Sequence, residues 1–159
     1  MRIKIFLILG VLILSTCKKS EVKEEYNDVT LDCKFSDNIL GICYYKIATS
    51  KYDELIVNDY ESFKRLGDSI KTNSIGINCD TAKLPAVDFV KYTLIAKRNG
   101  GGGCSVSYIR KVLIDSINKK VIYKVSATYS GMCYMLITSM NWAYIPKISN
   151  NYKVTFQFD

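Results

Sequence analysis

The sequence predicts a mainly β fold: an antiparallel sheet, arranged as a sandwich or a partly open barrel, with one short helix near residues 59–66. Two observations indicate this fold. From residue 87 to the C-terminus, apolar segments of strand length follow one another, with turn residues between them. Several of these segments alternate apolar and polar residues with a period of two, which is typical of strands that have one face in a core.

The single helix follows a short apolar run at residues 55–57. Asn58 or Asp59 is a suitable N-cap, and Gly67 indicates where the helix ends. Its apolar face is formed by residues at i, i+3 and i+6, namely Tyr60, Phe63 and Leu66. We expect residues 67–86 to form a loop.

The strands are expected over residues 92–96, 105–114, 121–129, 134–140 and 152–158. The short link Asp115–Lys120 predicts a hairpin between the second and the third of them. The segment 134–140 is mostly apolar, which predicts burial on both faces. In the last strand, the residues expected to point inward are Tyr152, Val154, Phe156 and Phe158.

Composition excludes several classes of site. The chain has 159 residues, a net charge of +7 and no histidine, so it has no Ser-His or Cys-His nucleophile pair and no His-ligated metal. The positive charges are scattered rather than gathered with aromatic residues, so we expect no nucleic-acid partner. There is no C-x-x-C pair for a metal, and a strand follows the glycine run where a phosphate-binding loop needs a helix. We therefore predict neither a metal nor a cofactor.

The N-terminus has the order of a signal peptide. Arg2 and Lys4 precede ten residues without a polar side chain, 5–14, a run too short to span a membrane as a helix. Leu14-Ser15-Thr16-Cys17 resembles the lipobox of bacterial lipoproteins, with Thr16 where that family usually has Gly, Ala or Ser. The resemblance implies that residues 1–16 are removed and that Cys17 is lipidated. The alternatives are an uncleaved N-terminal anchor and a secreted protein cut elsewhere.

Residues 17–30 are expected to be the lipidated cysteine and a flexible tether, because they are polar and carry mixed charges. The acidic clusters at residues 20–21 and 23–25 resemble the surface-export signals of Bacteroidota lipoproteins; a solvated spacer is the alternative. The resemblance implies a lipid anchor in the outer membrane, with the domain facing either the periplasm or the cell surface. Residues 31–159 would then form a single β-rich domain.

Five cysteines remain after Cys17. Cys104 and Cys133 each lie beside a glycine turn at the end of an expected strand, and export allows disulfides, so we predict that these two are bonded. Cys33 and Cys43 are the second candidate pair. That pairing would leave Cys79 free, although Cys79 could equally pair with either of them.

The glycine run at residues 100–103 is expected to form a flexible turn or to allow close approach of a ligand. A basic and aromatic rim beside it would suit partner contacts. Its candidate binding residues are Lys97, Arg98, Gly102, Gly103, Tyr129 and Tyr134. The alternative is a turn whose disulfide only stabilises the fold.

A second resemblance covers residues 54–159. The order of a strand, a helix, the Asp88-Phe89 dipeptide, a strand and a glycine-rich turn is similar to the C-terminal domain of the B-type subunit family of a protease complex. Here Gly102-Gly103-Cys104 replaces the glycine-tyrosine turn of that family. The Cys104 and Cys133 motifs, with residues 140–142 and 145–147 (MNW and IPK), are also similar to uncharacterised Bacteroidota lipoproteins. These resemblances imply a non-catalytic accessory domain.

Two functions remain from different classes. The first is a membrane-anchored binding or accessory module, without enzymatic activity, for a protein or glycan partner in the cell envelope. The alternative is an envelope hydrolase that uses carboxylates such as Asp80, Asp88 or Asp115. Such an enzyme needs two carboxylates about 5–10 Å apart in a shared cleft, and no spacing in the sequence indicates one.

Overall fold

The computed structural model describes residues 24–36, 53–73 and 84–159. The expected signal peptide, Cys17, Cys43, Cys79 and Asp80 lie outside these residues. The helical elements are η1 (Thr30–Asp32) and α1 (Tyr60–Asn73), and the strands are β1 (Asn27–Asp28), β2 (Lys34–Ser36), β3 (Glu54–Val57), β4 (Tyr92–Gly102), β5 (Ser105–Asp115), β6 (Lys120–Ser130), β7 (Leu136–Pro146) and β8 (Lys153–Phe158).

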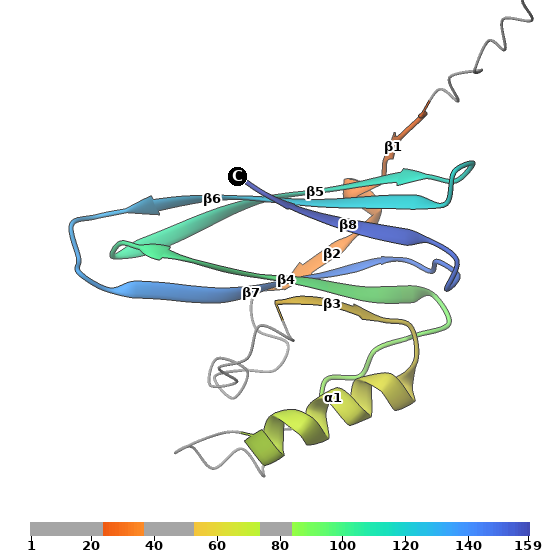
Figure 1. Cartoon of the computed structure of the whole chain (residues 1–159), viewed down its shortest axis with the longest axis horizontal. Helices are drawn as coiled ribbons and strands as arrows, with labels where there is room; N and C mark the ends of the chain where they lie inside the picture. Colours follow the sequence, from red (N-terminus) through yellow and green to blue (C-terminus); the bar gives the residue numbers. More distant parts are fainter. Residues whose placement is uncertain (1–23, 37–52, 74–83) are drawn as a thin grey trace, which may run out of the picture.

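The strands form two four-stranded sheets that pack face to face, and α1 covers the outer face of one of them (Figure 1). The strand order is β1-β5-β6-β8 in the first sheet and β2-β7-β4-β3 in the second. All pairs are antiparallel except β6 with β8, which is parallel. The predicted mainly β, mostly antiparallel fold with one helix is confirmed, in the form of an unclosed sandwich.

The main core lies between the sheets. Its fully buried residues come from alternate positions of β5 and β6 on one side and of β4 and β7 on the other, and include Val112, Val121, Tyr123, Ile95 and Ala143. The expected hairpin is present, since β5 and β6 pair from Ser105–Ser130 to Asp115–Lys120. The alternating burial of β5 and β6 agrees with the expected period of two.

A second core lies between α1 and the other face of β4 and β7. Phe63 and Leu66 of the helix pack there against Leu94, Ala96 and Trp142. Because β4 has apolar neighbours on both faces, every residue from Thr93 to Ala96 is fully buried. This central position explains its short, continuous apolar run.

The helix begins as predicted, with the Asp59 carboxylate accepting a hydrogen bond from the Ser62 amide at 2.7 Å. Its predicted end is wrong, because α1 continues past Gly67 to Asn73. Gly67 instead gives room to the Leu84 side chain, whose methyl carbons would stand 2.9 Å from an added Cβ. Close packing, not termination, is the role of this glycine.

The glycine run also differs from the expected turn, because Gly100, Gly101 and Gly102 belong to β4. Each pairs with a residue of β7, from Thr138 to Leu136. Strand pairing with a neighbour compensates for the low intrinsic strand preference of glycine.

At the N-terminus, ordered pairing starts earlier than the predicted boundary at residue 31. Asn27 and Asp28 pair with Ile114 and Leu113 of β5, and Val29 packs against the main core. The Asp28 carboxylate accepts hydrogen bonds from the amide and the hydroxyl of Thr30 and pairs with Lys111 at 2.9 Å. These partners, the Thr30 hydroxyl first, lower the pKa of Asp28 to about 2.

The C-terminal strand is present, with three of its four expected inward residues (Tyr152, Val154 and Phe156) packed against the main core. Phe158 differs, because 43% of its surface is exposed. β8 lies at the edge of its sheet, and Phe158 is its last residue.

Candidate functional site

Cys104 and Cys133 form the predicted disulfide, with their Cα atoms 4.9 Å apart. The bond joins two points at which the chain passes from one sheet to the other. Cys104 lies between β4 and β5, and Cys133 lies between β6 and β7. The disulfide therefore ties the two crossings together at one end of the sandwich.

The two crossings have different lengths. Gly102 pairs with Leu136, and Ser105 pairs with Ser130, so Gly103 and Cys104 on one strand face residues 131–135 on the other. Residues 131–135 thus form the longer, outer path around a corner, and Gly103 and Cys104 form the inner one. This difference in length lets the ribbon of two paired strands bend from one sheet into the other. Gly131 begins the outer path with a φ of +86°, where a Cβ would also stand 2.4 Å from the Cys104 sulfur.

We call residues 131–136 the corner loop. Its large apolar side chains lie in solvent, with exposed fractions of 98% for Met132, 63% for Met135 and 77% for Leu136, while Tyr134 is fully exposed. The prediction that residues 134–140 are buried on both faces is therefore wrong at its N-terminal end. Pairing with β4 begins only at Leu136, and burial is complete only from Met140.

The corner loop is held by backbone contacts as well as by the disulfide. The Gly103 amide donates to the Met135 carbonyl at 3.1 Å, and the Cys104 amide donates to the Ser130 carbonyl at 2.7 Å. Beside them, the hydroxyls of Ser105 and Ser130 are 2.7 Å apart. These bonds place the apolar side chains on an anchored loop, which reduces the entropy lost when a partner binds.

Lys97 and Arg98 do not form a common rim. As neighbours in a strand they point to opposite faces of the sheet, and each has an acidic partner. The Lys97 ammonium lies 2.6 Å from Glu54, and the Arg98 guanidinium lies 3.6 Å from Asp53. The predicted basic rim is thus divided between two ion pairs.

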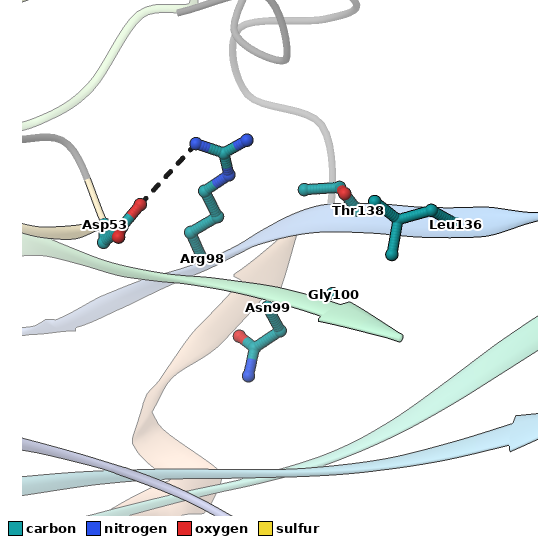
Figure 2. Close-up of a pocket in the computed structure, with 6 residues that line it drawn as sticks. All are labelled: Asp53, Arg98, Asn99, Gly100, Leu136 and Thr138. Atoms are coloured by element: carbon teal, nitrogen blue, oxygen red, sulfur yellow. Dashed lines mark ion pairs between the residues drawn. The ribbon is translucent and has the colours of Figure 1, made fainter. Parts of the chain in front are cut away.

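Arg98 lines a hollow of about 310 Å³ at the base of the corner loop, together with Asp53, Asn99, Gly100, Leu136 and Thr138. Figure 2 shows Arg98 reaching toward Asp53 on one side of β4, whereas Asn99 points to the other side. Leu136 belongs both to this hollow and to the corner loop, so the two features are continuous.

Tyr129 is placed differently from Tyr134, its expected companion in the rim. Its ring lies over Gly101 between the sheets, and burial, with the nearby Tyr108, raises the pKa of Tyr129. The hydroxyl oxygens of Tyr108 and Tyr129 are both buried. Of the two tyrosines predicted for the rim, Tyr134 is fully exposed and Tyr129 is partly buried.

A polar cluster between the sheets has no counterpart in the predicted site. Arg110 of β5 donates from Nε and Nη2 to the Asn141 side-chain oxygen of β7, at 2.8 and 2.6 Å. Its guanidinium also lies over the rings of Tyr108 and Phe35. Asn141 is fully buried beside Trp142 in the MNW segment, so this segment is accounted for by the interior of the fold. An isolated Asn within an apolar strand was the only signal for this cluster.

The second expected disulfide, Cys33–Cys43, is not formed, because Cys33 is a free thiol. Its sulfur donates to the Val29 carbonyl, and its side chain packs against the main core. Burial, with help from Asp32 and Asp28, raises the pKa of Cys33 to about 12. The turn into β2 thus directs this side chain inward.

The two described carboxylates of the hydrolase alternative each stabilise a turn. Asp88 accepts hydrogen bonds from the Val90 and Lys91 amides before β4. Asp115 is buried and accepts bonds from the Ile117 and Asn118 amides in the hairpin, and the bonds from Asn118 lower the pKa of Asp115. Both carboxylates therefore have a structural function.

Among residues 24–36, 53–73 and 84–159, no group of three or more potential ligands from His, Cys, Asp and Glu is gathered as a metal site requires. Within the same ranges, no helix has both the length and the apolar character needed to cross a membrane.

Comparison with known proteins places the chain in no family: no family model, no curated protein and no solved structure matches it. The lipoprotein and protease-complex resemblances therefore stay predictions.

Proposed function

We propose that this protein is a lipid-anchored, non-catalytic binding module of the bacterial cell envelope, and that its corner loop inserts into an apolar hollow of a partner protein. The observation that carries the proposal is the exposure of four large apolar side chains on one clamped loop, Met132, Tyr134, Met135 and Leu136. Methionine and aromatic residues are enriched at protein interfaces, and contiguous exposed apolar surface marks interaction sites.

The shape and composition of the loop favour a protein over a glycan. The loop protrudes at an end of the sandwich (Figure 1), so its counterpart is concave. Three of its four apolar side chains are aliphatic or thioether groups without strong hydrogen-bonding atoms. A glycan, whose hydroxyls need hydrogen-bond partners, would gain little from them.

The position of the loop also distinguishes a protein partner from the membrane. The N-terminal segment enters the fold at β1, beside Leu113 and Ile114, near the hairpin end of β5. The corner lies at the other end of β5, about 30 Å away at about 3.3 Å per residue. The corner loop is therefore at the end of the domain opposite the point where the lipid-bearing segment enters, which favours a protein partner over the bilayer that holds the chain.

Lipidation is tested by Cys17→Ser in the native host. We expect the variant to leave the membrane fraction or to persist as an uncleaved precursor, because acylation precedes cleavage in the lipoprotein pathway that the lipobox implies. Fractionation and intact mass measure this. Unchanged mass and unchanged detergent partitioning would contradict the anchor.

The docking loop is tested by placing a photo-crosslinking amino acid at Met132 in the full-length, membrane-bound protein. The matched control is Ile117, which is 73% exposed but lies in the hairpin at the other end of the domain. We expect one discrete protein adduct from position 132 and not from 117. The adduct should disappear when Tyr134→Ser and Leu136→Ser are added.

Other adducts would contradict a protein partner. An adduct at position 132 that is degraded by glycosidases would indicate a glycan, and adducts to lipid alone would indicate membrane insertion. The proposal also fails if position 132 gives no adduct, or if the protein adduct survives both serine substitutions.

A further inference from the structure

Among the described residues, the outer edge of β5 is open along most of its length. On one side, β5 pairs with β6 from Ser105 to Asp115. On the other side, β1 pairs only with Leu113 and Ile114 (Figure 1). After β1, η1 leads the chain to β2 in the other sheet. Within the described ranges, no strand pairs with residues 105–111 on this side.

The backbone groups along this edge point outward in a regular row. Val112 shows their direction, since its amide donates to the Thr30 hydroxyl and its carbonyl accepts from the Val29 amide, each at 3.0 Å. In an antiparallel strand, alternate residues direct their backbone groups to the same edge. Tyr108 and Val106 therefore present an amide and a carbonyl to the open side. A row of donors and acceptors with this repeat matches another extended polypeptide.

A hollow of about 500 Å³ lies at the end of this open edge that is next to β1. It is lined by Asp28, Thr30, Leu31, Ile109, Arg110 and Lys111. Its apolar residues are strongly exposed: Leu31 completely, and Ile109 by 75%. The charge of Lys111 is paired with Asp28. The hollow thus offers an apolar pocket beside a row of outward-facing backbone amides and carbonyls.

We propose that the open edge of β5 binds an extended segment of a partner polypeptide, which pairs with the backbone of Val106 and Tyr108 and places an apolar side chain between Leu31 and Ile109. The backbone row supplies affinity and the hollow supplies selectivity, as in other cases of strand addition. The ordered N-terminal segment already passes through β1 into β2, and the C-terminal strand β8 lies at the opposite edge of the sheet. None of the described residues is therefore positioned to occupy this edge, and its backbone groups match an extended segment of a partner. This surface is separate from the corner loop and does not depend on it.

The test uses the full chain, labelled with ¹⁵N and purified in mild detergent, and a soluble peptide of alternating Val and Thr with one central Leu. Amide hydrogen exchange is followed by NMR. We expect the amides of Val106 and Tyr108 to exchange rapidly in the free protein and to be protected by the peptide. Ile109→Glu should weaken peptide binding by about tenfold or more, because it places a charge in the apolar hollow.

The matched control is Ile56→Glu, which changes another exposed isoleucine, on edge strand β3. This control and the corner variants Tyr134→Ser and Leu136→Ser should leave peptide binding unchanged. The proposed docking role of the corner loop and the proposed peptide binding at the β5 edge are therefore tested independently. The inference is overturned if the two amides are already protected in the free protein, including by self-association through β5. It is also overturned if the peptide protects neither amide, or if Ile109→Glu has no more effect than Ile56→Glu.

Discussion

The ring of Tyr129 in β6 lies so close to the backbone of Gly101 in β4 that a Cβ atom at Gly101 would stand 2.4 Å from the Tyr129 Cε2 atom. The two residues belong to different sheets, and they meet just inside the corner at which the ribbon folds over. The glycine run therefore has a packing function at this position. It allows an aromatic ring of one sheet to cover the backbone of the other.

Gly101→Ala is expected to lower the free energy of unfolding by about 1–3 kcal/mol, because the added methyl group forces the Tyr129 ring or the strand to move. Gly100→Ala is the matched control. A Cβ there would have its nearest contact, the Thr138 hydroxyl, at 3.4 Å. Urea denaturation, followed by the fluorescence of Trp142, measures both variants. Equal effects of the two substitutions would contradict this role of Gly101.

The disulfide is expected to contribute about 3–4 kcal/mol to stability, because it closes a long loop and so restricts the unfolded chain. Its cysteines are 29 residues apart in the sequence. The double variant Cys104→Ser with Cys133→Ser should show this loss in denaturant melts of oxidised protein. Under reducing conditions, the variant and the parent should differ much less. Peptide mapping without reductant provides the direct check, and free thiols at both positions would refute the bond.

Asp28 is expected to make the attachment of β1 sensitive to acid. Its folded-state pKa of about 2 lies below the ordinary value of about 4. The carboxylate therefore contributes its full stabilisation above about pH 4, and this contribution is lost as the pH falls through about 2. Melting temperatures measured between these pH values should fall less steeply for Asp28→Asn than for the parent. Identical slopes would contradict the assignment.

The Cys33 thiol is expected to react slowly with iodoacetamide in the native protein at mildly alkaline pH. Its pKa of about 12 leaves almost no thiolate, which is the reactive form. Unfolding in urea exposes the side chain and should make labelling fast. Mass spectrometry of the Cys33 peptide measures both rates, with and without urea. Rapid labelling of folded protein would show that the thiol is accessible and ionised.

Several features of the fold were predictable because they depend on neighbouring residues. The alternation of β6 identified its buried face, the short Asp115–Lys120 link predicted the hairpin, and Asp59 predicted the start of α1. The Cys104–Cys133 bond was predictable because each cysteine lies beside a glycine turn at the end of an expected strand. In each case, the local pattern and the tertiary contacts agree.

The sequence by itself thus determined the class of fold, most strands, the beginning of the helix and the disulfide. Only the tertiary structure decided that β8 lies parallel to β6, that α1 continues past Gly67, and that the corner loop leaves Tyr134 and Leu136 in solvent. The physical reason is that apolar character shows which residues gain free energy from burial, but not whether a partner surface reaches them. At the corner, the outer path has three residues more than the inner one, and this excess carries its side chains beyond both sheets.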